Sequence, residues 1–389
     1  MTKGRKEQPH ISRKAREVKP FFVMEILERA QELEREGRSI IHLEVGEPDF
    51  PTPKVVSEAA MVALADGKTC YTHSLGLIEL REAIAENYHA KYGIEVSPGQ
   101  IVVTSGTSPA MSLVFSTILS PGDEVLLTDP HYACYPNFIR TADGKPRFVP
   151  VKEEDGFQLT TDQIEKHIDS NVAAILINSP ANPTGTLISE EVMRKIAETD
   201  ALVVSDEIYH GLVYGEREHT ILEYTDSAFV VNGFSKLYAM TGWRIGYLIA
   251  PPDYVRTIQN LHQNFFISAN CFVQWAAITA LKETNEEVRR MVDIYNERRR
   301  YIVGALRELG LSVKAEPRGA FYVLAGASHI SGDSMALAHE ILEKAGVAVA
   351  PGIDFGEGGE GYLRFSYANS LENIREGVRR LGEFLKNRR

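Results

Sequence analysis

The sequence predicts an α/β protein in which a large domain with a mostly parallel sheet, flanked by helices, is joined to a smaller α+β domain. Three observations support this prediction. The chain has 389 residues, more than one ordinary domain contains. Short β-branched runs alternate with segments of helical periodicity through its middle part, as in sheets covered on both faces. A long helical segment then precedes a region with a few further strand-like runs.

The N-terminal region is expected to contain one helix, over residues 17–36. Its apolar residues fall on one face, and Gly37 marks its end. Residues 1–16 are basic and polar, and they are expected to form a flexible terminus. A loop rich in glycine and proline follows the helix at residues 46–51.

The large domain is expected to cover residues 46–289. Helical stripes occur around Leu80 and around Val114. Strand-like runs alternate with such helical segments, which predicts a doubly covered sheet. The strand-like runs are residues 101–104, 125–127, 173–177, 201–204, 229–231 and 245–249.

The small domain is expected to combine residues 17–45 with residues 290–389. The periodicity of residues 284–309 predicts one long helix that links the two domains. After this helix, three short runs predict strands of the small domain: residues 311–313, 321–324 and 362–365.

Composition excludes several classes of protein. Apolar residues make up 44% of the chain and charged residues 24%, as in soluble globular proteins. The longest apolar runs are too short to span a bilayer, and residues 1–19 lack the apolar core of a secretory signal. The net charge of −11, without a long basic block beyond the N-terminus, argues against a nucleic-acid partner.

The cysteines indicate a reducing compartment and no metal site. Cys70, Cys134 and Cys271 are an odd number and lack the spacing of metal ligands. They are therefore expected to be reduced packing residues, and the protein is expected to be cytoplasmic.

Three polar residues follow predicted strands of the large domain. Asn182 lies in the loop after residues 173–177, Asp206 follows residues 201–204, and Lys236 follows residues 229–231. Each residue alone has an ordinary explanation, as a turn, a helix cap or a surface charge. Because the carboxyl ends of parallel strands meet at one edge of a sheet, where ligands gather, their joint placement predicts a site there.

A phosphate-binding loop is predicted at residues 105–108. This Ser-Gly-Thr-Ser segment lies between a predicted strand and an amphipathic helix, so its N–H groups and the helix dipole point at one spot. Arg244 could complete the cradle with a bidentate contact. Ordinary helix capping by Thr107 or Ser108 explains the segment equally well, since its spacing matches neither a P-loop nor a dinucleotide fingerprint.

Residues 233–247 resemble the lysine signature of class I/II aminotransferases, which depend on pyridoxal phosphate (PLP). The eight-residue step from Lys236 to Arg244 matches this signature. The resemblance extends, in the order of the family, from about residue 40 to the C-terminus. It implies the PLP-transferase fold of type I, aspartate/aromatic aminotransferase-like, with a seven-stranded sheet. Further matching segments are residues 46–50, 71–76, 178–185, 205–209, 317–322 and 349–352, followed by Arg364.

The resemblance implies the catalytic residues. Lys236 would carry PLP covalently and then act as the base that moves the substrate α-proton, for which it needs a lowered pKa. Asp206 would keep the pyridine nitrogen protonated, so that the ring acts as an electron sink. Asn182 and Tyr209 would donate to the ring oxygen of PLP.

The resemblance also implies the remaining cofactor contacts. Thr107, Ser108, Ser235 and Arg244 would bind the phosphate, and Tyr132 would stack on the ring. Gly233 departs from the family, because some relatives carry a phosphate-binding serine there. Tyr71 would reach the phosphate of the neighbouring subunit, which implies a homodimer with shared active sites.

For the substrate, the resemblance assigns Arg364 as the clamp of the α-carboxylate, helped by Asn182 and the Gly46 N–H. The expected reaction moves the amino group of an L-amino acid, aromatic, apolar or aspartate, to a 2-oxo acid such as 2-oxoglutarate. The apolar stretch 20–23 favours aromatic or larger apolar donors over aspartate. A PLP-dependent lyase of the same fold, such as a C–S lyase, is the alternative; a ligand-sensing regulator would need a DNA-binding domain, for which the residues before Gly46 are too few.

Overall fold

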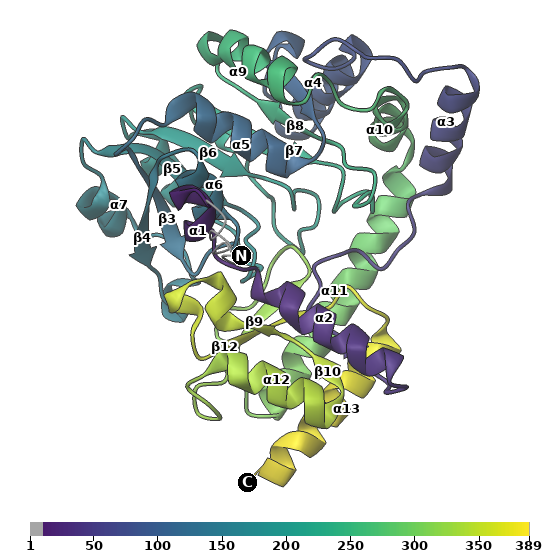
Figure 1. Cartoon of the computed structure of the whole chain (residues 1–389), viewed down its shortest axis with the longest axis vertical. Helices are drawn as coiled ribbons and strands as arrows, with labels where there is room; N and C mark the ends of the chain where they lie inside the picture. The colour runs from purple at the N-terminus through teal and green to yellow at the C-terminus, as the bar shows by residue number, and fades with distance from the viewer. Residues whose placement is uncertain (1–10, 389) are drawn as a thin grey trace, which may run out of the picture.

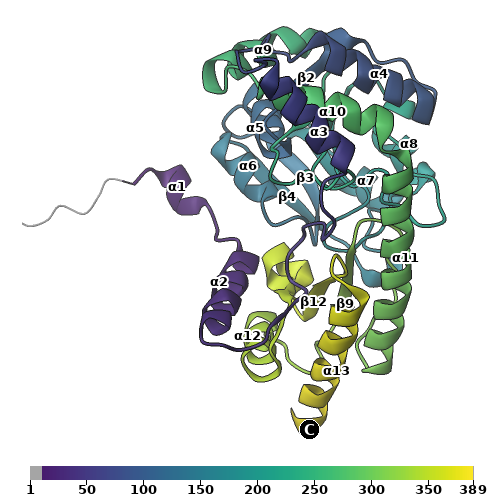
Figure 2. The same cartoon turned by 90° about the vertical axis from the view of Figure 1, so that its right-hand side faces the viewer.

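The computed structural model describes residues 11–388 (Figure 1). Helix α11 runs past the seven-stranded sheet and continues along the part of the chain that contains β9, β12 and α13 (Figures 1 and 2). The α-helices are α1 Arg13–Glu17, α2 Phe22–Arg35, α3 Lys54–Ala65, α4 Ile78–Tyr92, α5 Thr107–Ile118, α6 Tyr135–Thr141, α7 Thr161–His167, α8 Glu190–Ala197, α9 Pro252–Phe265, α10 Cys271–Glu283, α11 Asn285–Glu308, α12 Ser334–Ala345 and α13 Leu371–Arg388.

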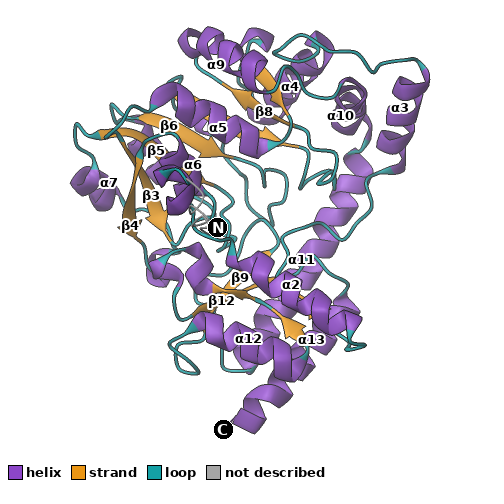
Figure 3. Ribbon diagram, in the orientation of Figure 1, coloured by secondary structure: helices purple, strands orange, loops and turns teal. Residues whose placement is uncertain are grey.

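The strands form three sheets, and the largest confirms the predicted one (Figure 3). Its seven strands have the order β2-β8-β7-β6-β5-β3-β4, and only β8 runs antiparallel to its neighbours. The strands are β1 Ile41–His42, β2 Ile101–Thr104, β3 Glu124–Asp129, β4 Lys145–Pro150, β5 Val172–Asn178, β6 Leu202–Asp206, β7 Ala228–Gly233, β8 Gly246–Ile249, β9 Tyr322–Gly326, β10 Val347–Ala348, β11 Ala350–Pro351 and β12 Tyr362–Ser366.

Both faces of the seven-stranded sheet are buried, which explains why its strands are apolar without alternation. Successive residues of β5 point to opposite faces: Ile175 and Ile177 pack in one core with α3, α4, α8 and α10. Ala174 and Leu176 pack in the other core with α5, α6 and α9. Helices therefore cover both sides of the sheet, as the alternation of strand and helix patterns predicts (Figure 3).

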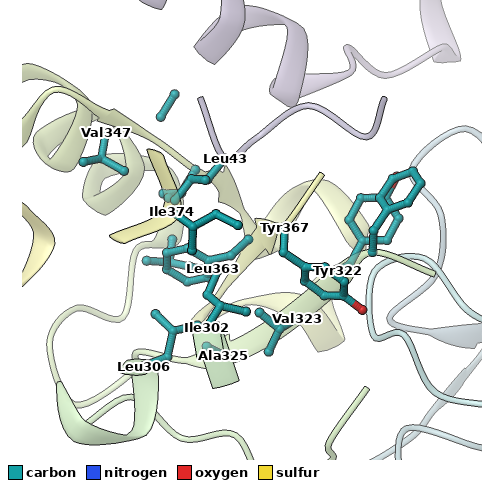
Figure 4. Close-up of a cluster of buried hydrophobic side chains, with 14 of the residues drawn as sticks. Leu43, Ile302, Leu306, Tyr322, Val323, Ala325, Val347, Leu363, Tyr367 and Ile374 are labelled. Carbon is teal, nitrogen blue, oxygen red and sulfur yellow. The ribbon is translucent and has the colours of Figure 1, made fainter. Parts of the chain in front are cut away.

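A further core holds the C-terminal part of the chain together. Side chains of α2, α11, α12 and α13 pack around the β11-β12-β9 sheet and the β1-β10 pair. Figure 4 shows ten labelled members of this cluster, with Tyr322 at one end and Val347 at the other. The same cluster includes Ile208 and Tyr209, which follow β6 of the large sheet, so this core adjoins the carboxyl edge of that sheet. The domain boundaries after residues 45 and 289 stay a prediction.

The N-terminal region differs from expectation in two ways. The predicted helix over residues 17–36 begins only at Phe22, because Pro20 has no N–H to donate and disfavours helical geometry at Lys19. Within the segment expected to be flexible, residues 1–10 lie outside the described part, but α1 forms at residues 13–17. Lys14 Nζ anchors α1 to Asp143 at 2.6 Å.

The C-terminal strands agree with two of the three predicted runs. Residues 321–324 and 362–365 correspond to β9 and β12, and residues 284–309 correspond to α11. Residues 311–313 form no strand; Ser312 makes a single isolated bridge to Gly326. No helix within residues 11–388 combines the length and the hydropathy that a membrane span requires.

Candidate active site

A cavity of about 330 Å³ lies at the carboxyl edge of the large sheet, and this volume falls within the range of small-molecule sites. The parallel register places Asn178 beside Asp206, and Asp206 beside Val231, so β5, β6 and β7 deliver their following loops to one place. The cavity brings together nearly all of the predicted site residues: Gly46, Thr107, Ser108, Tyr132, Asn182, Asp206, Tyr209, Ser235, Lys236, Arg244 and Arg364.

Lys236 lies in the cavity with its amino group on a backbone carbonyl. Its Nζ donates to the carbonyl oxygen of Gly46 at 2.6 Å. Removal from water lowers the pKa of Lys236 to about 8, and the positive charges of Arg364 and Arg244 act in the same direction. Glu47 and Asp206 oppose this shift. The amine therefore loses its proton closer to neutral pH than an exposed lysine does, and the neutral form is the nucleophile.

Asp206 ends β6 as a buried carboxylate. Tyr135 Oη donates to Asp206 Oδ2 at 2.7 Å, and the Ile208 N–H donates to Oδ1 at 3.1 Å. Burial raises the pKa of Asp206 to about 6 despite these hydrogen bonds and the charge of Lys236. A carboxylate held in this way favours a cation placed against it, since the cation offsets the cost of burial.

The predicted phosphate-binding loop lies at the N-terminus of α5. Gly106 has a φ of 101°, a conformation that favours glycine, and a Cβ there would collide with the guanidinium of Arg244. A Cβ at Gly246 of β8 would lie 3.1 Å from the Thr107 nitrogen. Two glycines thus let Arg244 and β8 approach this loop closely. The resulting arrangement combines a helix N-terminus with a guanidinium, which suits an anion.

Arg364 is fixed from several sides. Its Nη1 donates to Asn182 Oδ1 at 2.8 Å, and its Nη2 donates to the Glu44 carbonyl. The guanidinium lies between two rings, with its carbon 4.4 Å from the centroid of Tyr322 and 4.7 Å from that of Phe355. The side chain is 2% exposed, and its Nε is buried without a hydrogen-bond partner in the described residues.

Aromatic side chains form another wall of the cavity. Tyr132 packs edge-on against Tyr135, with ring centroids 5.2 Å apart, and against Phe21 at 6.0 Å. Tyr209 Oη lies 2.9 Å from Tyr322 Oη, and burial raises the pKa of both phenols. Both therefore remain protonated over the neutral range and can donate hydrogen bonds.

Tyr71 is the one predicted site residue that does not line the cavity. Its side chain is 81% exposed on the surface of its own chain. The adjacent Thr72 is held by Ser268 and Gln274, so the segment that carries Tyr71 is fixed at this surface.

Several cavity residues escaped the sequence analysis. Tyr135 bonds to Asp206 across 71 positions of the chain, and Tyr322 reaches Tyr209 across 113 positions. Nothing in the local sequence indicates such pairings, although Tyr322 ends the matched segment 317–322 and Tyr135 lies close to Tyr132. Glu47, between two matched residues of the loop 46–50, also lines the cavity, and its carboxylate bonds to the Thr241 hydroxyl.

Comparison with known proteins identifies a family and many relatives. The model of the family described as aminotransferase class I and II matches residues 38–381. The (5-formylfuran-3-yl)methyl phosphate transaminase of Methanocaldococcus jannaschii is 42% identical over 379 residues, with 96% of this chain and 99% of that protein covered. The aspartate/prephenate aminotransferase of Thermus thermophilus is 39% identical, with 96% and 98% covered.

Solved structures agree with this result. The aspartate aminotransferase of Thermus thermophilus with maleate superposes with a TM-score of 0.93 at 37% identity, covering 97% of this chain and all 100% of that one. A Methanococcus jannaschii protein, described as similar in its active site to kynurenine aminotransferases, gives a TM-score of 0.91 at 42% identity, with 97% and 100% covered.

The match to the family model covers most of the chain, the relatives match over nearly their whole length, and the fold is that of aspartate aminotransferase. The family depends on PLP, which agrees with a cavity that combines a lysine, a buried carboxylate and a helix N-terminus suited to an anion. This chain therefore belongs to the class I and II aminotransferases and is a PLP-dependent enzyme that acts on amino acids and 2-oxo acids.

Proposed function

We propose that this enzyme transfers the amino group of an aromatic or large apolar L-amino acid to a 2-oxo acid such as 2-oxoglutarate. The cavity wall carries this proposal: Phe21, Val23 and Met24 line it, as the apolar stretch at this place predicts. Within residues 11–388, the cations that line the cavity are Lys236, Arg244 and Arg364. All three are proposed to act on the cofactor or the α-carboxylate, which leaves no cation in this wall for the second carboxylate of aspartate.

The relatives are named for different substrates. Proteins of similar identity to this chain are named for a furan aldehyde phosphate, for aspartate and prephenate, and for aromatic amino acids. All of these names denote transfer of an amino group, which favours transfer over the lyase alternative.

The cofactor roles proposed here follow from the contacts in the cavity. When bound, PLP supplies a protonated ring that stabilises the negative charge left when the substrate α-proton is removed. Asp206 is proposed to hold the proton on the ring nitrogen, because a cation there would offset the cost of burying this carboxylate. Thr107, Ser108, Ser235 and Arg244 are proposed to hold the phosphate. Tyr132 is proposed to stack on the ring, with Asn182 and Tyr209 at the ring oxygen.

Lys236 is the proposed covalent attachment point and the group that moves the α-proton. Its pKa of about 8 suits a base that must accept and return a proton near neutral pH. The Gly46 carbonyl, which accepts from Nζ at 2.6 Å, is a local acceptor that would orient the amine when it is released from PLP.

Arg364 is the proposed clamp of the α-carboxylate that both substrates share. Asn182 and the Glu44 carbonyl hold one nitrogen each, and two rings hold the plane of the guanidinium. The clamp therefore loses little side-chain freedom when a substrate binds. Its buried, unpartnered Nε is a donor that a substrate carboxylate could satisfy. The Gly46 N–H is proposed to assist.

We further propose a homodimer in which each site uses residues of two chains. Large apolar side chains are exposed on α3 and near Tyr71, which is unusual for a surface that meets only water. The exposed residues are Met61, Val62, Leu64, Tyr71, Ile78, Phe265, Phe266 and Ile267. A reducing cytoplasm remains the proposed compartment, because Cys70 is a free, exposed thiol.

The choice of donor is tested with 2-oxoglutarate as acceptor and each amino acid in turn as donor. We expect glutamate to form with kcat/KM about tenfold or more higher for phenylalanine than for aspartate, the factor that one charge-assisted contact supplies. Met24→Arg should reduce this preference, because it adds a cation to the apolar wall, whereas Met24→Leu should not. A preference for aspartate in the unaltered enzyme contradicts the proposed donor, and release of ammonia and pyruvate without glutamate would support a lyase.

Burial of the ionised Asp206 carboxylate should lower the free energy of unfolding of the PLP-free protein. The folded carboxyl has a pKa of about 6 against an ordinary value of 3.8, so the folded state binds more protons between these values. Stability therefore falls as the pH rises from about 4 to 6, and the penalty is complete above pH 6. Asp206→Asn should raise the free energy of unfolding at pH 8, measured by urea denaturation, by up to about 3 kcal/mol. This gain should shrink toward pH 4.

The matched control for this effect is Asp226→Asn, at an exposed aspartate. It should leave the midpoint nearly unchanged at both pH values. A loss of stability in Asp206→Asn at pH 8 would mean that the hydrogen bonds from Tyr135 and Ile208 outweigh the cost of burying the charge.

Arg364→Lys should weaken amino acids and oxo acids together. An ammonium cannot make the two-pronged contact, so we expect both KM values to rise by about ten- to a hundredfold. The absorbance of bound PLP and the reaction with a simple amine that lacks a carboxylate should hardly change. Arg299→Lys is the control, because Arg299 is buried outside the cavity on Glu316. The clamp role is wrong if PLP is lost or if only one of the two substrates is affected.

Mixed dimers test the shared site. Lys236→Ala should be inactive, and Tyr71→Ala should bind PLP weakly. A dimer with one chain of each kind has one site with both defects and one site with neither. Mixing the two variants through mild denaturation and refolding should therefore restore tight PLP binding and about half of the normal activity per mixed dimer. If Tyr71 served its own chain, mixing would restore nothing.

A further inference from the structure

Tyr322 lies where the proposed cofactor contacts and the proposed substrate clamp meet. It begins β9, and its side chain is 1% exposed. Its hydroxyl is 2.9 Å from that of Tyr209, while its ring faces the guanidinium of Arg364 at 4.4 Å. Tyr322 is a member of the buried cluster in Figure 4, so the same core that stabilises this part of the chain anchors its ring. The family resemblance assigned no role to its hydroxyl.

The hydroxyl of Tyr322 has little freedom to move. A Cβ at residue 46 would collide with it, so a glycine is required there for the two to coexist. The carbonyl of that same Gly46 accepts from Lys236 Nζ. Tyr322 Oη is therefore confined beside Tyr209 and beside Gly46, the residue whose carbonyl contacts the amine of Lys236.

Tyr209 depends on this confined hydroxyl for its orientation. Among the described residues, Tyr322 provides the hydrogen bond that its hydroxyl makes. A phenol that accepts one hydrogen bond can still donate one, and accepting a bond makes it a stronger donor. If Tyr322 donates to Tyr209, the proton of Tyr209 is left free to point into the cavity.

We propose that Tyr322 is a positioning residue whose hydroxyl donates to Tyr209 and so orients and strengthens the hydrogen bond from Tyr209 to the ring oxygen of PLP. This inference rests on the proposed role of Tyr209. It separates two functions of one side chain: the hydroxyl acts on the cofactor through Tyr209, and the ring supports Arg364.

The pKa of the Lys236–PLP linkage, read from the absorbance of the bound cofactor, measures the hydroxyl's effect. Donation by Tyr209 stabilises negative charge on the ring oxygen and thereby lowers that pKa. Tyr322→Phe keeps the ring and removes the hydroxyl, so the pKa should rise by about 0.3–1 unit, the range that loss of one neutral hydrogen bond permits. Tyr322→Leu lacks the hydroxyl as well and should give a similar rise.

Substrate kinetics measure the effect of the ring. Tyr322→Phe should leave the KM values of amino acid and oxo acid within about twofold, because a ring still faces Arg364. Tyr322→Leu removes that face, and both KM values should rise by about two- to fivefold. If Tyr322→Phe raises KM as much as Tyr322→Leu does, the hydroxyl contacts the substrate and the positioning role is overturned.

Tyr367→Phe is the matched control. Its hydroxyl is buried in the same core and donates to the Ala320 carbonyl at 3.2 Å, a carbonyl to which Tyr214 also donates. This variant loses a buried phenol hydroxyl without altering the cavity, and the pKa of the linkage should not change. A shift in Tyr322→Phe no larger than that in Tyr367→Phe overturns the inference.

Tyr209→Phe completes a double-mutant cycle and separates this inference from the proposed function. Because Tyr322 acts through Tyr209, the double variant Tyr209→Phe/Tyr322→Phe should show the pKa of Tyr209→Phe alone. Additive shifts contradict an action through Tyr209. If Tyr209→Phe itself leaves the pKa unchanged, the proposed role of Tyr209 fails; if only Tyr322→Phe has no effect, that role stands and the present inference fails.

Discussion

The burial of charged side chains around one cavity is the constraint on which the rest of the site depends. Lys236, Asp206 and Arg364 each lose hydration there, and each is compensated differently. The lysine gives up part of its basicity, the aspartate takes a phenol hydrogen bond, and the arginine is held by an amide, a carbonyl and two rings. The free energy stored in these unfavourable environments is what a charged cofactor and a carboxylate substrate can recover when they bind.

The two parts of the fold divide this work. The large sheet supplies the groups proposed to face the cofactor, since its parallel strands end at one edge. The core around β9 and β12 supplies Arg364 and Tyr322, which are proposed to act on the substrate side. Asn182 connects the two, because it follows β5 of the large sheet and accepts a hydrogen bond from Arg364 of β12. The proposed substrate clamp and the proposed cofactor contacts are thus linked by one hydrogen bond.

Periodicity predicted the large sheet and α11 well, because buried parallel strands and a long amphipathic helix leave strong local patterns. The position of a polar residue after each strand sufficed to bring Asn182, Asp206 and Lys236 together. Tyr135 and Tyr322 could not be predicted, since their roles depend on partners far along the chain and a tyrosine has no local pattern that names its partner. The start of α2 at Phe22 was not predicted, and the helix was placed from residue 17 instead, because periodicity ignores the missing N–H of Pro20.

The extended residues 18–21 carry a consequence for how this enzyme can diversify. They connect α1, which is fixed on the large sheet's side through Lys14 and Asp143, to α2, whose first N–H groups are capped by Asp354 of the other part. Phe21, at the end of this segment, and Met24, in the first turn of α2, line the cavity. Insertions, deletions or substitutions in so short a surface segment alter the wall without touching Lys236, Asp206 or Arg364. Changes in residues 18–21 can therefore alter the substrate specificity of the enzyme during evolution, while the residues proposed for the chemistry stay the same.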